Sequence, residues 1–360
     1  MCDVPALRFP EFTGEWKSVH LEDVAEFQKK RISSDLLNNN NYISTENILQ
    51  NFEGIQYSSS IPTNTNVIEY QKGDILLSNI RPYLKKVWFS DRKGGCSADV
   101  FVLRGDKCDQ HFLYYVIASD RFINYVMSGV KGVKMPRGDK NQMKKYAFSI
   151  PTNTEQRKIA KFLSMLDERI KLQNKIIEKY ESLIKGIAQN VARNNKPNIR
   201  LSECLECSSS TLQESDVCEN GTYPVYGANG IVGYLDNYNA EKEAVYIIKD
   251  GSGVGTVSYV TGKCSATGTL NTLQAKEGYS LQYLYYMLKV FNFEPYKTGM
   301  AIPHIYFKDY GKAKIFCPSY TEQLKYVGVL STIDNKLSAE QSILTDLSLQ
   351  KQYLLHQMFI

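Results

Sequence analysis

An internal repeat constrains the fold of this chain more than any other feature of its sequence. The segment IPTNTEQRKIAKFLSMLDERI, which starts at Ile150, matches CPSYTEQLKYVGVLSTIDNKL, which starts at Cys317. One constant shift places Pro151 on Pro318 and aligns the Thr-Glu-Gln triplets and a later aspartate without a gap. The sequence therefore predicts two copies of one structural unit.

Each copy of the repeat begins a long helix with one apolar side. Apolar residues recur at alternating steps of three and four, which is the heptad spacing of a coiled coil. Gln173 interrupts this helix-pair seam in the first copy, and Glu340, at the equivalent position, and Lys351 interrupt it in the second. The first seam comprises Ile159, Leu163, Leu166, Ile170, Ile177, Tyr180, Ile184, Ile187 and Val191. The second comprises Tyr326, Leu330, Ile333, Leu337, Leu344, Leu347, Leu354 and Met358.

Seams of equal length and register favour packing of the two helices on each other. One polar residue at the same level of each helix then fixes the register. Each helix runs about 37 residues, or about 55 Å at ~1.5 Å per residue, which is longer than a domain of ordinary size. The alternative is that each seam packs only on its own neighbouring module.

The regions before the two helices repeat more loosely, and they predict mixed α and β modules. VHLEDVAEF from Val19 resembles IRLSECLEC from Ile199, and other short matches follow at shifts that vary from one match to the next. In each module, β-rich runs separated by Gly, Pro, Asn and Ser clusters precede an aromatic-rich helix. The first module has runs at 74–77, 86–89 and 100–103 and a helix at 111–127, and the second has runs at 244–248, 255–260 and 270–274 and a helix at 281–291.

The predicted fold class is α+β, with two mixed α/β globular modules, two long helices and an internal pseudo-twofold repeat. We place a joint at 194–198, where Pro197 prevents the first helix from continuing. The predicted domains are a first module at 1–153, a central helix at 154–196, a second module at 197–320 and a C-terminal helix at 321–360.

Composition and charge narrow the class of protein. With 360 residues, 43% of them hydrophobic, the chain has apolar material for two cores. It has no signal-peptide pattern and no apolar run near the roughly 20 residues that a membrane helix needs, and its eight cysteines are scattered. We therefore expect a cytoplasmic protein with reduced thiols. The net charge of +5 is concentrated in the first half, whereas residues 197–320 carry 10 basic and 12 acidic side chains.

The short motifs argue against a metal site or a catalytic centre. Cys204 and Cys207 form a CxxC, but the repeat aligns them with Val24 and Phe27, which predicts the buried face of one short helix rather than zinc ligands. The glycine-rich stretch at 251–255 precedes a β-like run and lacks the Walker spacing, which favours a turn between strands. The four histidines are dispersed outside recognisable motifs, and we expect no catalytic residue and no bound metal.

These features together resemble the specificity subunit of Type I restriction-modification systems. The matching phrases are LRFPEF from Leu7, followed by Trp16, and YPVYGANGIVGY from Tyr223, together with the two Pro-x-x-x-Glu-Gln helix starts. The resemblance covers nearly the whole chain. Its most specific part is the duplicated order of module, helix, module and helix.

The resemblance implies that each module is a target recognition domain for one half of a split, asymmetric site in double-stranded DNA. The helices would pack antiparallel as a spacer and as a platform for two methyltransferase subunits. S-adenosylmethionine, ATP and Mg would be bound by those methyltransferase subunits and by the restriction (translocase-endonuclease) subunits, and this chain would bind no cofactor. The alternative is a non-catalytic coiled-coil adaptor whose modules bind protein partners.

Basic and polar side chains in two loop regions of each module are the candidate DNA contacts. Phosphate contacts would position the modules, and contacts with base edges would specify the sequence. The competing interpretation is that these lysines are merely solvated. The candidates in the first module are Arg81, Lys85, Lys86, Lys131, Lys134, Arg137 and Lys140. Those in the second are Lys249, Ser252, Lys297, Thr298, His304, Tyr306 and Lys308.

Overall fold

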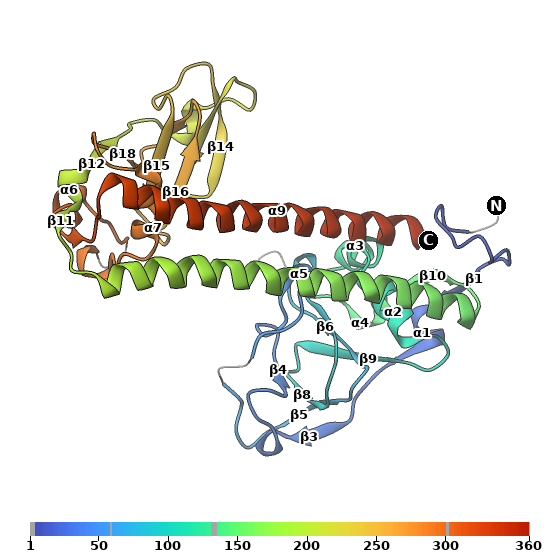
Figure 1. Cartoon of the computed structure of the whole chain (residues 1–360). Helices are drawn as coiled ribbons and strands as arrows, with labels where there is room; N and C mark the ends of the chain where they lie inside the picture. The colour runs from blue at the N-terminus through green and yellow to red at the C-terminus, as the bar shows by residue number, and fades with distance from the viewer. Residues whose placement is uncertain (1–3, 58–59, 131–134, 300–301, 360) are drawn as a thin grey trace. The chain divides into compact units, whose positions relative to one another are not determined.

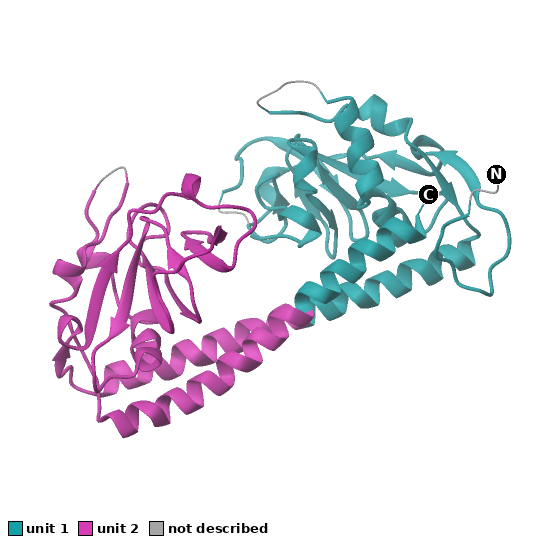
Figure 2. Ribbon diagram, turned by 90° about the horizontal axis from the view of Figure 1, so that it is seen from above, with its two compact units in different colours: residues 1–172, 344–360 teal, residues 173–343 magenta. Residues whose placement is uncertain are grey.

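The structure is a computed structural model, and it describes residues 4–57, 60–130, 135–299 and 302–359. The chain forms two compact units, one made of Met1–Leu172 with Leu344–Ile360 and the other of Gln173–Ile343 (Figure 2). Each unit combines a globular α/β module with one part of each long helix. Helix α5 spans Asn153–Asn194 and helix α9 spans Tyr320–Met358, so the two helix starts are related by the same shift as the sequence repeat.

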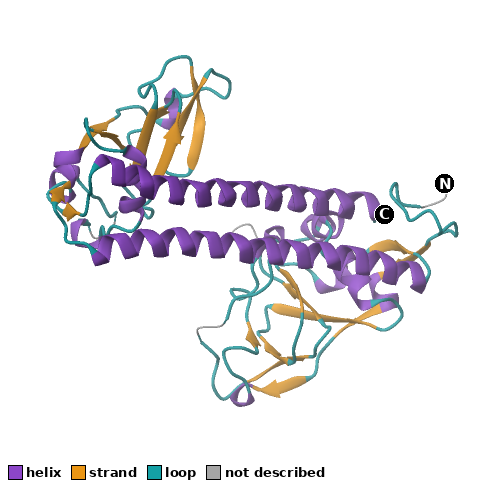
Figure 3. Ribbon diagram, in the orientation of Figure 1, coloured by secondary structure: helices purple, strands orange, loops and turns teal. Residues whose placement is uncertain are grey.

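The module of the first unit contains two four-stranded sheets and a short two-stranded one (Figures 1 and 3). One sheet has the order β2-β9-β6-β7, the second β3-β5-β8-β4, and the third β1-β10; all pairs are antiparallel except β4 with β8. The strands are β1 (Lys17–His20), β2 (Ala25–Phe27), β3 (Arg31–Ser33), β4 (Tyr42–Ile43), β5 (Asn66–Tyr70), β6 (Ile75–Ser78), β7 (Val87–Phe89), β8 (Gly94–Cys96), β9 (Val100–Gly105) and β10 (Ala147–Ile150). The α-helices before α5 are α1 (Leu21–Val24), α2 (Gln110–Ile117), α3 (Asp120–Ser128) and α4 (Lys140–Lys144).

The module of the second unit repeats this plan. Its sheets have the orders β12-β18-β15-β16, β14-β13-β17 and β11-β19, and β13 with β17 is again the parallel pair. The strands are β11 (Ile199–Arg200), β12 (Leu205–Ser209), β13 (Tyr223–Gly227), β14 (Gly230–Leu235), β15 (Glu243–Ile248), β16 (Val257–Thr261), β17 (Ser265–Ala266), β18 (Leu270–Ala275) and β19 (Lys314–Ile315). Its helices are α6 (Leu201–Cys204), α7 (Leu281–Lys289) and α8 (Phe307–Tyr310). The duplicated α+β architecture is thus confirmed.

Two local predictions need correction. The helix expected at 111–127 is two helices, α2 and α3, because the Ser119 hydroxyl accepts from the Phe122 N–H and caps a new helix start. Cys204 and Cys207 do not share one helix, since Cys204 ends α6 and Cys207 lies in β12. Burial raises the pKa of the Cys204 thiol to about 12 and that of Cys207 to about 11.

No group of metal-binding side chains occurs among the described residues.

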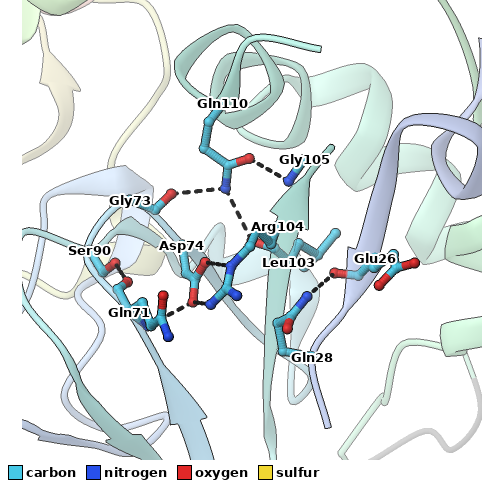
Figure 4. A network of polar contacts seen from close by, with 10 residues as sticks. All are labelled: Glu26, Gln28, Gln71, Gly73, Asp74, Ser90, Leu103, Arg104, Gly105 and Gln110. Atoms are coloured by element: carbon cyan, nitrogen blue, oxygen red, sulfur yellow. Dashed lines mark hydrogen bonds and ion pairs between the residues drawn. The ribbon is translucent and has the colours of Figure 1, made fainter. Parts of the chain in front are cut away.

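A polar network anchors the start of β6 in the first module (Figure 4). The buried carboxylate of Asp74 accepts two hydrogen bonds of 2.7 Å from the guanidinium of Arg104, on the neighbouring strand β9. Gln110, at the start of α2, accepts from the Gly105 N–H (2.5 Å) and donates to the Gly73 carbonyl (2.8 Å). Because charge-assisted bidentate pairs are strong and directional, this end of the sheet is held rigidly, and it lies opposite the turn that leaves β6.

The long helices pack on each other along the predicted seam, and within each unit the two helix segments lie side by side (Figure 2). None of the seam residues is exposed. In the first unit, the start of α5 and the end of α9 enter one core through Leu163 and Leu354, and Asp167 pairs with Lys351 (2.6 Å). The segments are therefore antiparallel. The first unit's module shares this core, so packing between the helices and packing on the module both occur.

The polar residues of the two seams meet in the second unit. The side-chain amide of Gln173 donates to the backbone carbonyl of Glu340 (2.9 Å) and also to its carboxylate. Gln173 is buried, so sliding either helix by one residue would leave its amide without a partner among apolar neighbours. This pair confirms the predicted polar contact at matched seam positions.

The glutamine of each Pro-x-x-x-Glu-Gln start joins its helix to its module. The buried Gln156 side chain accepts from the backbone N–H of Asp109 (2.8 Å) and donates to the carbonyl of the repeat's own proline (2.8 Å). Gln323 makes the same two bonds, with the Ser280 N–H (2.8 Å) and with the second proline (2.9 Å). Asp109 and Ser280 are the N-caps of α2 and α7, so one amide fixes two helix starts in each copy.

The preceding glutamate behaves differently in the two copies. Glu155 is 1% exposed and accepts from Arg8 through two hydrogen bonds (2.7 and 2.8 Å) and from the indole N–H of Trp16 (3.3 Å). Arg8 of the LRFPEF phrase and the tryptophan that follows it therefore bind the N-terminal segment to the start of α5. Glu322 is exposed and accepts from the Ser319 hydroxyl (3.0 Å).

Candidate nucleic-acid interface

In the first module, two loop segments that are distant in sequence meet at the end of β6. The turn after β6 contains Arg81, whose backbone is left-handed (φ 51°), and its N–H donates to the Pro136 carbonyl (2.8 Å). The Gly138 N–H donates in return to the Asn79 carbonyl (3.0 Å), and Ile80 and Arg137 form an isolated β-bridge. The predicted loop therefore docks on the predicted turn. Both Arg81 and Arg137 are exposed.

The three described lysine candidates of the first module already have partners in the protein. The Lys85 ammonium pairs with Asp120 (2.5 Å), and that of Lys86 donates to the Thr45 carbonyl (2.8 Å). Lys140 lies 4.7 Å from the centre of the Phe27 ring. Burial lowers the pKa of both Lys86 and Lys140. Lys131 and Lys134 lie outside the described residues.

The second module brings its candidates together in the same way. Its loop docks on the glycine turn between β15 and β16 through two backbone bonds of 3.0 Å, from the Gly251 N–H to the Pro303 carbonyl and from the Ile305 N–H to the Lys249 carbonyl. The turn between strands predicted at 251–255 is confirmed. His304 forms isolated β-bridges with Asp250 and with Thr298.

The remaining side chains of the second module lie on the same two segments. Lys297 pairs with Glu294 (2.6 Å), and the Lys308 ammonium lies 5.2 Å from the centre of the Tyr306 ring. Tyr306 is 49% exposed, and Ser252 is also exposed. Exposed aromatic, hydroxyl and cationic groups thus surround the point where the loop meets the turn.

The backbone contacts of the two docking arrangements are equivalent. Pro136 and Pro303 both accept from the turn, and they are related by the same shift as the helix repeat. Arg137 and His304 are therefore counterparts, and each has a carboxylate partner: Asp99 for Arg137 (3.1 Å) and Asp250 for His304 (2.6 Å). Sequence reasoning missed both aspartates.

The long helices also expose apolar side chains outside the seam. In the first unit, α5 exposes Phe162, Met165 and Leu172. In the second unit, exposed positions occur on both helices, at Ile176, Leu183, Leu324, Val329 and Ile343. Exposed apolar side chains that form a contiguous patch are typical of protein association sites. No helix within the described ranges combines the length and the apolar character that a bilayer-spanning segment requires.

The duplicated frame, with an equivalent docked loop in each module, defines a protein built from two matched α/β modules and two long helices. Residues 13–182 and 197–348 match the family model of the Type I restriction modification DNA specificity domain. The chain belongs to this family.

Curated relatives agree with that assignment. The chain is 27% identical over 116 residues to the Type I restriction enzyme EcoprrI specificity subunit of Escherichia coli, covering 32% of this chain and 29% of that protein. It is 24% identical over 161 residues to the EcoDI specificity subunit of E. coli, covering 44% and 36%. A putative specificity subunit of Haemophilus influenzae, S.HindORF215P, is 33% identical over 89 residues, covering 24% and 23%. The matches thus span less than two fifths of each curated relative.

The fold is similar to that of two solved structures. The S subunit of a Type I restriction-modification system from M. genitalium superimposes with a TM-score of 0.67 at 19% identity, covering 99% of each chain. A chain from a study of complex assembly and conformational transition in the type I restriction-modification system superimposes with a TM-score of 0.52 at 19% identity, covering 94% of this chain and 96% of that one. At this identity the likeness concerns the fold.

Proposed function

We propose that this chain is the DNA sequence-specificity subunit of a Type I restriction-modification complex. Each module reads one half of a bipartite, asymmetric site, and the helix pair sets the spacer between the halves. The observation that carries this proposal is the matched docking of a loop on a strand turn in both modules, which presents the polar side chains of Arg137 and His304 from equivalent positions. Family membership over most of the chain supports it.

The proposed division of labour follows from the side chains available. The chain itself catalyses no step, and S-adenosylmethionine, ATP and Mg are bound by partner subunits. The exposed apolar side chains of the helices are the proposed platform for two methyltransferase subunits and for the restriction subunits, because burial of such surface drives association. The complex acts in the cytoplasm, where double-stranded DNA is the substrate.

The modules differ in how they meet the DNA backbone. The first has the exposed cations Arg81 and Arg137 beside its docked loop. Residues 197–320 carry two more acidic than basic side chains, so the second module contributes local contacts, and partner subunits neutralise the phosphates around it. The affinity of the complex for DNA should fall steeply with salt concentration.

Methylation mapping tests the proposed function. The full chain is co-expressed with the methyltransferase encoded beside its gene, and the methylated bases of the host DNA are mapped by sequencing. We expect adenine methylation at one split, non-palindromic motif. Methylation without sequence preference, or none at all, contradicts the specificity role. If the neighbouring genes encode no methyltransferase, the coiled-coil adaptor becomes the better hypothesis.

A further inference from the structure

The tips of the two docked loops carry different side chains at one equivalent position. Arg137 follows Pro136 and His304 follows Pro303, and both tips are fixed to the adjacent turn by the same pattern of backbone hydrogen bonds. The identical backbone places these two side chains at corresponding points of their modules. Their chemistry differs, however, as expected if the two modules read different bases.

Each of these side chains is oriented by a carboxylate from its own module. The guanidinium of Arg137 meets Asp99 at 3.1 Å, and Asp99 is itself tied to the turn because its carbonyl accepts from the Asn79 N–H (2.8 Å). Nδ1 of His304 meets Asp250 at 2.6 Å. A carboxylate only accepts, so Nδ1 carries a proton in this pair and Nε2 is the remaining polar atom of the ring.

Stability does not explain these pairs. The side chains of Arg137 and Asp99 are 53% and 37% exposed, and those of His304 and Asp250 are 35% and 37% exposed. Ion pairs this exposed contribute little to the stability of the fold. The loops are already docked by backbone hydrogen bonds, so the carboxylates restrict side-chain orientation more than they hold the fold. Restricting a side chain before binding reduces the entropy lost on contact with a ligand.

The neighbouring lysines are less suited to reading bases. Lys85 and Lys86 direct their single ammonium groups to Asp120 and to the Thr45 carbonyl. A guanidinium with one amine paired still offers its other N–H groups in a planar fork, and a histidine with Nδ1 paired still offers Nε2. Arg137 and His304 thus combine a fixed orientation with polar groups that have no other side-chain partner among the described residues.

The geometry points to Arg137 and His304 as the specificity-determining residues of the two modules, one for each half-site, with Asp99 and Asp250 as positioning residues. This inference rests on the proposed function. The fork of Arg137 matches the O6 and N7 acceptors of guanine in the major groove. Nε2 of His304, an acceptor when the ring is neutral, matches the amino group of adenine or cytosine.

The test compares the methylation motifs of variant complexes with that of the wild type. We expect Arg137→Ala to relax one base position in one half-site, with discrimination reduced about 5- to 150-fold, which corresponds to the 1–3 kcal/mol of a bidentate contact. His304→Ala should relax one position in the other half-site. The matched controls Lys72→Ala and Lys242→Ala alter exposed cations before β6 and β15, at the opposite end of each strand from the turn, and should leave the motif unchanged.

Two further variants separate base reading from phosphate contact and from positioning. Arg137→Lys keeps the charge but loses the fork, so the relaxed position should persist, whereas a phosphate contact would be restored. Asp99→Ala should relax the same base as Arg137→Ala, and Asp99→Glu should recover part of the discrimination. The inference is overturned if Arg137→Ala and His304→Ala both leave the motif unchanged, or if both change the same half-site. If the wild type itself methylates no split motif, the proposed function fails first.

Discussion

The ion pair between the partly buried Arg8 and the buried Glu155 supports a quantitative prediction about the first unit. Among the described residues, Arg8→Ala leaves the carboxylate of Glu155, which is 1% exposed, with the indole N–H of Trp16 (3.3 Å) as its one side-chain donor. Removing one partner of a buried ion pair costs about 3–5 kcal/mol, because the other charge stays desolvated and unpaired. A unit of this size loses about 2–4 °C per kcal/mol, so its unfolding midpoint should fall by at least about 6 °C.

The repeat supplies a matched control for this measurement. Glu322 occupies the equivalent position of the second copy but is exposed, so Glu322→Gln should change stability by less than about 0.5 kcal/mol. The assay is differential scanning calorimetry of the full chain in its purified complex, with the lowest-temperature transition followed in each variant. A drop of less than about 2 °C for Arg8→Ala, or equal drops for both variants, refutes the reasoning.

A double variant separates the unpaired charge from lost packing. Arg8→Leu combined with Glu155→Leu removes both charges and keeps apolar volume at the start of α5. Replacing a whole buried ion pair with apolar residues is often neutral or stabilising, so most of the lost midpoint should return. If the double variant unfolds as early as Arg8→Ala, the loss comes from packing of the N-terminal segment and not from the uncompensated carboxylate.

Two other predictions concern the frame and the thiols. Gln156→Leu and Gln323→Leu each remove two equivalent hydrogen bonds and leave two backbone groups unpaired, so each should lower the free energy of unfolding by about 2–6 kcal/mol. Calorimetry should show the same loss for both variants to within about 1 kcal/mol. Clearly unequal losses contradict the equivalence of the two copies. Alkylation at pH 8, followed by peptide mass spectrometry, should modify the exposed Cys218 well before Cys204. Burial raises the pKa of the Cys204 thiol to about 12, so roughly 1 in 10,000 molecules carries the thiolate at that pH. Equal labelling rates contradict the burial of Cys204.

The helical frame could be predicted from the sequence because its signals are local. Heptad spacing predicted the residues of the seam, and the polar residue at the same position of each seam predicted the contact between Gln173 and Glu340. The break between α2 and α3 was also detectable, since Ser119 followed by Asp120 is a typical helix start. The helix prediction at 111–127 was wrong there because a continuous apolar pattern outweighed the capping signal.

The candidate site was predictable only in part, because its contacts depend on strand pairing. Charge and glycine content identified the loops, but the sequence did not show that Lys86 would bind the Thr45 carbonyl, 41 residues away. Nor did it show that Asp250 would face His304, 54 residues away. Such partners follow from the register of whole sheets, and no periodicity within a short segment encodes them.

The constant shift in residue number between the two copies of the repeat extends beyond the long helices. This explains how one helical frame can carry two different modules. The shift that relates Pro136 to Pro303 holds through the long helices, so the loop tip belongs to the same fixed block as the helix start. The turn on which each tip docks lies outside this block, because the step from Asn79 to Lys249 is longer than the step from Pro136 to Pro303. The tip therefore has a constant backbone position, while its side chain and the turn beneath it are free to vary. If Arg137 and His304 read the DNA as proposed, substitutions there or in the turns change the recognised bases without disturbing the hydrogen bonds that join module to helix.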